Sequence, residues 1–304
     1  MNSGASLQAD PLLLAQLYRW LGRLLLDGRT ATIQELVLRL PELVEDLAET
    51  DPEALAAAHY HVLGREIPPY ASVFCAADGQ VGGWVTDWYH RCYRTVGFIP
   101  DPRQEPADHL GQILHFLAFC LQQGTPEREE AARRLLHGEG LSWLPLFTFA
   151  VARQQIPFME RVVGLVAELI QTHRARVPPA ACSEPLPWPD PAVPGPEAGI
   201  SQLAVYLTTP IRCGFFLSLS DLQQLGRQLN LPVGFGRRAQ VLETLFHTAA
   251  LHDRAQALLE ALLALVEDWW HYLKTEALEA VIWRKRLEAT WTLLQAARKT
   301  LGSL

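Results

Sequence analysis

The stretch Gln104-Glu105-Pro106-Ala107-Asp108-His109-Leu110 decides the fold, because it begins an apolar helix. Pro106 sits at a helix start, where a missing N–H does no harm, and Asp108 is placed to cap the free amides that follow. Apolar residues then recur at helical spacing. They are Leu110, Ile113, Leu114, Leu117 and Leu121. The stretch therefore predicts a helix over residues 107–123.

Helix signals continue on both sides of this stretch. Asp10-Pro11 and Asp51-Pro52 each place a capping side chain before a proline at the first helical position. The other helices that we predict cover residues 33–49, 84–96, 126–137, 143–154, 157–174, 200–207, 238–250, 253–273 and 276–301. Ser220, with Gln223 in capping-box spacing, predicts a further helix. No long run alternates apolar and polar residues, so the predicted class is all-α.

A proline-rich segment divides the chain. Residues 177–199 contain eight prolines, which are unable to continue a helix and predict an extended linker. We therefore expect one helical domain over residues 1–176 and a C-terminal helical extension over residues 200–304. Few contacts normally cross such a boundary, so a chain ending near Arg176 should fold alone. In the alternative, the extension completes the core of the first domain.

Composition limits the function. The chain has 304 residues, is 49% hydrophobic and carries a formal charge of −7. An acidic balance argues against general nucleic-acid binding, which needs a basic face, and suits a basic partner. Five scattered cysteines without a Cys-x-x-Cys pair fit a reducing compartment. Residues 1–7 have no basic region, and the arginine-interrupted run 12–26 predicts an amphipathic helix, so we expect a cytoplasmic protein without a membrane span.

The order of the motifs is informative. A helix with Tyr60 and Leu63 precedes the turn Pro68-Pro69-Tyr70, and the Glu-Pro-Ala-Asp-His stretch and Trp143-x-Pro145-x-Phe147 follow. Over about residues 10–176 this order resembles the TorD/DmsD family of redox-enzyme maturation chaperones. The resemblance implies an all-helical cytoplasmic chaperone that is not an enzyme. Such a chaperone binds the twin-arginine leader and the apoprotein of a molybdopterin-dependent oxidoreductase, and it is a monomer or a domain-swapped dimer.

The resemblance also implies a leader-binding site. Its residues here are Tyr60, Leu63, Pro69, Tyr70, Glu105, Pro106, Asp108 and His109. The carboxylate of Glu105 is suited to a leader arginine through a charge-assisted bond. On sequence physics alone, Asp108 only caps its helix and His109 only bonds on the first turn. Gly64 departs from the family, which usually has an aromatic residue there.

An apolar groove is a further expectation. Val73, Phe74, Trp143 and Phe147, with Phe149 near them, are candidates to line a surface for the hydrophobic part of a leader. The alternative is that they are core residues, because Trp143 and Phe147 have the spacing of a buried helix face. The two possibilities predict opposite exposures for these side chains.

Other classes have weaker signals. His59 and His61 are two residues apart, so on a helix they point to different sides, and we expect no metal site. No P-loop, dinucleotide fingerprint or nucleophile elbow is present, and we expect no cofactor. Residues 219–231 loosely resemble a helix-turn-helix, which leaves two alternatives: a DNA-binding regulator, or a generic peptide or protein interaction module.

Overall fold

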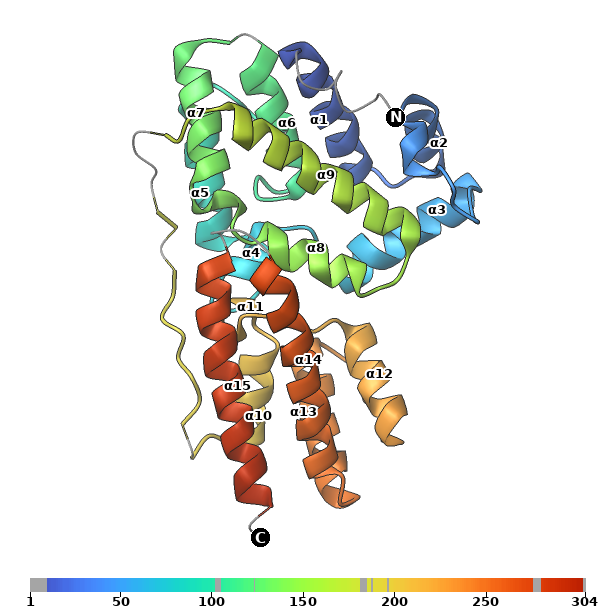
Figure 1. Cartoon of the computed structure of the whole chain (residues 1–304), viewed down its shortest axis with the longest axis vertical. Coiled ribbons are helices and arrows are strands. Elements are labelled where there is room, and N and C mark those ends of the chain that lie inside the picture. Colours follow the sequence, from blue (N-terminus) through green and yellow to red (C-terminus); the bar gives the residue numbers. More distant parts are fainter. Residues whose placement is uncertain are drawn as a thin grey trace. The chain divides into compact units, whose positions relative to one another are not determined.

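The computed structural model describes residues 10–101, 105–122, 124–180, 185–186, 188–195, 197–275 and 280–302. Helices form the fold, and within these ranges no strand occurs apart from an isolated bridge between Tyr70 and His109 (Figure 1). The predicted all-α class is confirmed. Gln104 of the opening stretch, Gln123, Cys182 and Glu276 lie outside the described residues.

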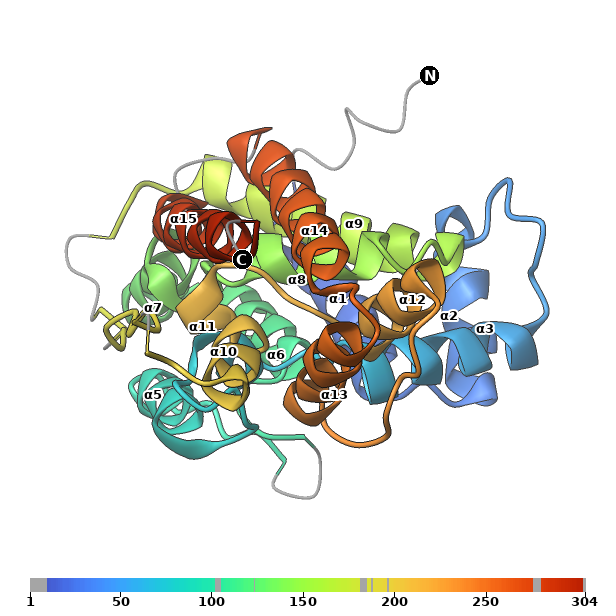
Figure 2. The ribbon, with the colours of Figure 1, turned by 90° about the horizontal axis from the view of Figure 1, so that it is seen from below.

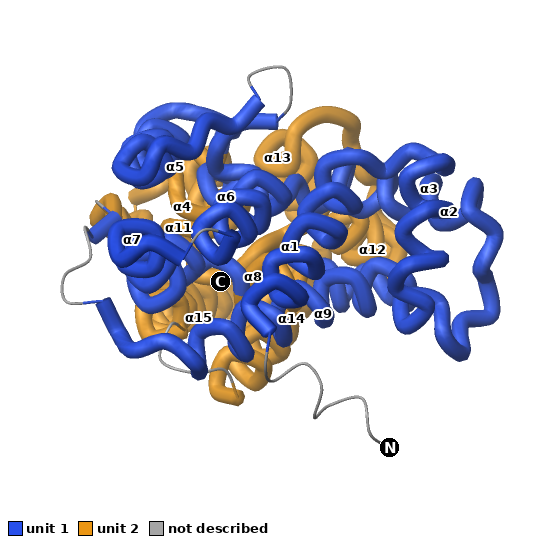
Figure 3. The backbone as a smooth tube through the Cα atoms, turned by 90° about the horizontal axis from the view of Figure 1, so that it is seen from above, with its two compact units in different colours: residues 1–73, 80–144, 151–187 blue, residues 74–79, 145–150, 188–304 orange. Residues whose placement is uncertain are grey.

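The chain divides into two compact units (Figure 3). Unit 1 comprises residues 1–73, 80–144 and 151–187, and unit 2 comprises residues 74–79, 145–150 and 188–304. Unit 2 therefore draws two short pieces from the sequence of the expected first domain. The domain boundary expected at residues 176 and 177 stays a prediction.

Most helices of the first half belong to unit 1, while α4 and α8 each contribute residues to both units. These helices are α1 (Pro11–Leu26), α2 (Thr30–Arg39), η1 (Pro41–Leu43), α3 (Pro52–His59), η2 (Tyr60–Glu66), α4 (Ala71–Cys75), α5 (Gly83–Arg94), α6 (Leu110–Gln122), α7 (Pro126–His137), η3 (Glu139–Leu141), α8 (Leu144–Ala152) and α9 (Pro157–Arg176). Asp10 and Asp51 cap α1 and α3 through their side chains, as predicted.

Helices α1 and α6 form the centre of unit 1. They approach closely because each has a glycine at the crossing. A Cβ atom at Gly22 would lie 2.9 Å from the carbonyl oxygen of Gly111, and one at Gly111 would lie 2.7 Å from that of Gly22. Both distances are shorter than a carbon–oxygen contact allows, so any larger residue would force the helices apart.

Two predicted helix boundaries are wrong. The helix expected over residues 33–49 ends at Arg39, because Pro41 is unable to continue it and begins the short 3-10 turn η1. The predicted cap at Ser220 is replaced by Ser218, which accepts from the backbone N–H of Asp221 while Asp221 accepts from that of Ser218. With this reciprocal capping box, the cap of α12 lies two residues before the predicted one.

Unit 2 is built from α10 (Ile200–Leu207), α11 (Pro210–Cys213), α12 (Leu219–Leu229), α13 (Arg238–Leu251), α14 (Ala255–Thr275) and α15 (Val281–Leu301). The pair α14 and α15 packs side by side (Figures 1 and 2). Trp269 and Trp283 on these helices are fully buried. They belong to the core of a helical bundle.

The pieces 74–79 and 145–150 take part in the core of unit 2. Phe74 stacks on Phe216 at 5.2 Å between ring centroids and meets Phe147 edge to face at 6.1 Å. Phe149 stacks on Tyr272 at 4.2 Å. Aromatic pairs at these separations stabilise a core beyond their buried area. The core of unit 2 therefore depends on residues from well before the proline-rich segment.

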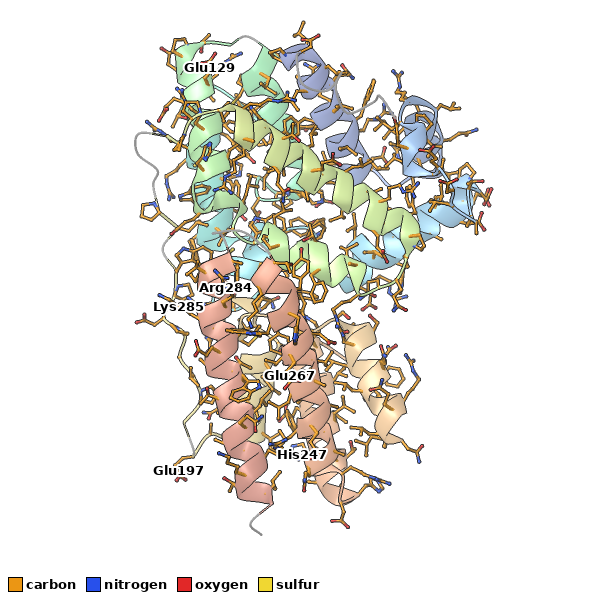
Figure 4. All side chains as sticks on the ribbon, in the orientation of Figure 1. Glu129, Glu197, His247, Glu267, Arg284 and Lys285 are labelled. Atoms are coloured by element: carbon orange, nitrogen blue, oxygen red, sulfur yellow. The ribbon has the colours of Figure 1, made fainter. Side chains whose placement is uncertain are left out.

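The end of that segment is also attached to unit 2. Trp188 meets Trp283 edge to face at 5.7 Å, and the carbonyl oxygen of Pro189 accepts a bond of 2.9 Å from the guanidinium of Arg286. The side chain of Arg286 is buried on α15, whereas that of its neighbour Lys285 is exposed. Figure 4 labels Lys285 and the preceding Arg284 to locate this turn of the helix. The extended segment is thus held by specific contacts from Trp188 onward.

Candidate functional site

Two motifs that are far apart in sequence lie together in unit 1. The backbone N–H of Leu110 donates to the carbonyl oxygen of Pro69 at 2.8 Å, and the N–H of Ala71 donates to that of Asp108 at 3.0 Å. These two bonds make the isolated bridge between Tyr70 and His109. The Pro-Pro-Tyr turn is therefore joined by its backbone to the Glu-Pro-Ala-Asp-His stretch.

Asp108 binds the turn through its side chain. Its buried carboxylate accepts from the N–H and the hydroxyl of Ser72 at 2.9 and 2.5 Å, and from the hydroxyl of Thr86 at 2.6 Å. The predicted cap on its own helix is wrong: Asp108 caps the start of α4 instead. A carboxylate satisfied by three donors fixes the relative positions of the segments that supply them.

His109 performs the local capping that was expected of Asp108. Its Nδ1 accepts from the N–H of Gly111 at 3.0 Å. Burial lowers the pKa of His109 to about 3, with smaller contributions from His59 and His115. The imidazole is therefore neutral at physiological pH. Its ring also packs edge to face on Tyr70, with 4.9 Å between the centroids.

The accessible part of the site is the pair Tyr70 and Glu105. The phenol of Tyr70 donates to Oε2 of Glu105 at 2.6 Å, and both side chains are half-buried. Burial raises the pKa of Tyr70, and the bond with Glu105 raises it further. The phenol therefore stays protonated and orients the carboxylate of Glu105.

Glu105 borders two grooves on unit 1, and Phe98 is the other residue that they share. The larger has a volume of about 990 Å³ and the smaller about 410 Å³. The larger lies along α1, α2 and α6, and the smaller is lined by α5, the segment that follows it, and residues 105–107. Pro106 lines the smaller groove. Both are large enough for side chains of a bound peptide.

Tyr60 and Leu63 lie elsewhere on unit 1. They belong to η2, a π-helix, where 66% of Tyr60 is exposed and Leu63 is buried. Neither lines the two grooves. A Cβ atom at Gly64 would lie 2.9 Å from the Tyr60 ring, so that ring occupies the space beside this glycine. The missing side chain of Gly64 therefore leaves room for the Tyr60 ring.

The side chains expected to line an apolar groove are buried. Val73 and Trp143 lie in the core of unit 1, and Phe74 and Phe147 lie in that of unit 2. The indole N–H of Trp143 donates to the carbonyl oxygen of Gly140 at 3.0 Å. This burial agrees with the core interpretation, and the role of these residues in leader binding stays a prediction.

Some residues of the site were missed from sequence. Ser72 and Thr86 hold Asp108, and Arg19, Trp20 and Phe119 line the larger groove. Ser72 had a signal, because it follows the Pro-Pro-Tyr turn by two residues. Arg19 resembled an ordinary solvated position on an amphipathic helix.

In the described ranges, no group of three His, Cys, Asp or Glu side chains is arranged to hold a metal ion. No helix in these ranges is both long and apolar enough to cross a membrane.

Comparison with known proteins identifies the family. No curated protein and no solved structure matches the chain. Residues 27–148, which include Tyr70, Glu105, Asp108 and His109, match the model of a family described as nitrate reductase delta subunit. The resemblance to the TorD/DmsD chaperones is thereby confirmed: the matched part of the chain is similar to this family of chaperones for molybdoenzyme maturation.

Proposed function

We propose that this protein is a cytoplasmic, non-enzymatic chaperone that binds the twin-arginine leader and the apoprotein of a molybdopterin-dependent oxidoreductase. It covers the leader, delays export and holds the apoprotein open until the cofactor is inserted. One observation carries the proposal: the carboxylate of Glu105 stands at the rim of both grooves, oriented by the Tyr70 phenol. An oriented carboxylate beside the smaller groove, whose lining includes Ile99 and Pro106, suits an arginine followed by apolar residues.

The buried members of the site act by positioning. Asp108 and His109 expose 0% and 3% of their surface, so a peptide on the surface does not reach them. Asp108 instead holds Ser72 and Thr86, and His109 supports the Tyr70 ring. We therefore assign direct contact to Tyr70, Glu105 and Pro106, and indirect roles to Pro69, Asp108 and His109. Tyr60, which is exposed, is proposed to contact a more distant part of the leader, with the buried Leu63 in an indirect role.

The regulator alternative has less support. Of the paired arginines at the start of α13, Arg238 donates to the carbonyl oxygen of Leu217 at 3.0 Å and lies over the Phe216 ring. Arg238 is thus engaged within unit 2, and of this pair only Arg237 remains to contact a phosphate of a DNA backbone. Duplex binding needs several such contacts.

Calorimetric titration with the leader peptide of the reductase subunit encoded beside this protein tests the proposal. The Glu105→Gln variant should bind about tenfold more weakly, because a charge-assisted bond contributes roughly 1.5–3 kcal/mol. Its melting temperature should match that of the parent. Glu129→Gln is the control, since Glu129 is exposed on α7 and borders neither groove (Figure 4). Equal affinities for parent and Glu105→Gln would refute the assignment of Glu105.

A further inference from the structure

The walls of the larger groove carry an unusual set of charges. Four arginines line it, at positions 19, 23, 29 and 39, together with three carboxylates, those of Asp27, Glu35 and Glu105. Arg29 binds Asp27 at 2.7 Å, and the Arg23 and Arg39 guanidiniums lie 2.9 and 3.2 Å from Glu35. Each of these two carboxylates is therefore occupied by a cation of the groove itself.

The remaining charges leave the groove basic. Glu105 accepts from Tyr70, at the rim. Arg19 forms no ion pair with any residue that the structure describes, and it is half-buried against the groove. Arg19 and Arg23 lie one helical turn apart on α1, with their Cβ atoms about 5–6 Å apart. Arg23 is paired with Glu35, so Arg19 is the cation of this wall that has no ion pair among the described residues, in a chain whose formal charge is −7.

The rest of the lining is aromatic. Trp20, Phe98 and Phe119 are each partly exposed to the groove. The Phe98 and Phe119 rings lie 5.3 Å apart, and the Arg39 guanidinium lies over Trp20 at 5.6 Å. Ring faces provide apolar contact area for the side chains of a bound peptide.

We propose that the larger groove binds an acidic peptide segment that also carries apolar side chains. This binding is separate from leader recognition, because the arginines of a leader are repelled by the α1 wall and meet Glu105 at the rim. Charge complementarity selects carboxylates, and the aromatic lining selects the apolar residues between them. The volume of about 990 Å³ exceeds what one small anion fills, which favours a peptide whose carboxylates alternate with apolar residues over a single phosphate.

Calorimetry with short blocked peptides tests this. The probe alternates glutamate with leucine, and its counterpart replaces each glutamate with glutamine. We expect the glutamate peptide to bind and to weaken as salt rises, because exposed charges are screened. Arg19→Gln should weaken it about tenfold, which corresponds to about 1.4 kcal/mol. Arg227→Gln, an exposed arginine on α12 outside the groove, should leave the affinity unchanged.

Three results would overturn the proposal. Equal binding of the glutamine peptide would mean that the groove selects apolar residues only. Absence of binding by the glutamate peptide would remove the site altogether. Inorganic phosphate that competes with the glutamate peptide at equal concentration, through the same Arg19, would reassign the groove to small anions. The leader assay on Arg19→Gln separates this proposal from the previous one, since leader affinity should be retained or slightly increased.

Discussion

Asp108 in unit 1 and Arg286 in unit 2 are both buried charged groups, and they are held differently. In unit 1 the Asp108 carboxylate accepts three hydrogen bonds from Ser72 and Thr86. In unit 2 the Arg286 guanidinium donates to the carbonyl oxygens of Ile211 and Pro189, while its Nε has no acceptor among the described atoms. The anion is fully satisfied by neutral partners, and the cation is only partly satisfied.

The two buried charges also differ in the segments of the chain that they hold together. Asp108 joins the turn at Ser72 and helix α5 at Thr86 to its own segment, and these surround the accessible pair Tyr70 and Glu105. Arg286 joins α15 to α11 and to the extended segment at Pro189. A buried charge therefore supports the proposed binding site in one unit and chain attachment in the other.

The largest expected effect concerns whether the first domain expected from the sequence folds without the C-terminal extension. A chain that ends at Arg176 loses the residues that cover Phe74 and Phe147, both fully buried. Exposing two phenylalanines costs roughly 3–6 kcal/mol, which is comparable to the total stability of many domains. We expect this shortened chain to be insoluble, as judged by gel filtration after expression.

Co-expression of residues 177–304 with the shortened chain is the control and should restore solubility. If the shortened chain alone stays soluble and melts cooperatively, the boundary expected from the proline-rich segment is correct, and the pieces 74–79 and 145–150 do not need the rest of unit 2.

Substituting the two buried charges tests the comparison directly. Asp108→Ala leaves three buried donors without an acceptor, so we expect the free energy of unfolding to fall by about 3–5 kcal/mol. Arg286→Met removes a partly satisfied cation and keeps an apolar chain of similar length, so we expect a change of about 1 kcal/mol or less. Urea titration of both variants measures the two values. Similar losses would show that the two charges are structurally equivalent.

Acid should affect unit 1 through His109. Its pKa is about 3 in the folded protein and about 6.5 when unfolded, so between these values only the unfolded state takes up the proton. The contribution of His109 to the free energy of unfolding is complete above about pH 6.5 and falls as the pH drops. At pH 5 the loss is about 2 kcal/mol. Thermal melts of parent and His109→Gln from pH 7 to pH 5 measure the difference in slope.

His247→Gln provides the control for that series, because His247 is exposed on α13 and solvent reaches its ring in both states (Figure 4). It should leave the slope of the parent unchanged. A slope for His109→Gln as steep as that of the parent would mean that other groups carry the acid sensitivity.

The smallest expected effect concerns the cap of α12. Ser218→Ala removes the acceptor for the N–H of Asp221 at 3.0 Å and should cost about 1 kcal/mol. Ser220→Ala, two residues along, should cost less than half of that, because Ser220 does not cap the helix. Urea midpoints of the two variants distinguish them, and the reverse order would restore the original assignment of the cap.

Local signals predicted much of the fold. The bounds of α7 follow from Thr125 and Pro126 at its start and were predicted correctly, as were those of α10. The helix expected through Pro41 failed because its apolar periodicity was given more weight than the proline. Ser218 was missed because Ser220 also has a capping-box partner at the right spacing.

The site was less accessible to sequence reasoning. The resemblance named both motifs, but the bonds between Asp108 and Ser72 span 36 residues, and no local pattern encodes them. A short-range cap at Asp108 was therefore the natural expectation. The basic groove was also missed. Arg23 and Arg39 pair with Glu35, whereas Arg19 has no ion pair among the described residues. This distribution of pairs depends on two helices lying side by side, which the sequence does not show.

The π-helix at Tyr60–Glu66 has a consequence for how this chain tolerates changes in length. Its turns close with wide bonds, such as that from the N–H of Ile67 to the carbonyl oxygen of Val62 at 2.7 Å, five residues earlier. An α-helix closes the same turn with one residue fewer. A single-residue deletion at Gly64 can therefore be absorbed by tightening the turn, with Ile67 and the Pro-Pro-Tyr turn kept in place. The same deletion within α1 would rotate every later side chain of that helix out of register.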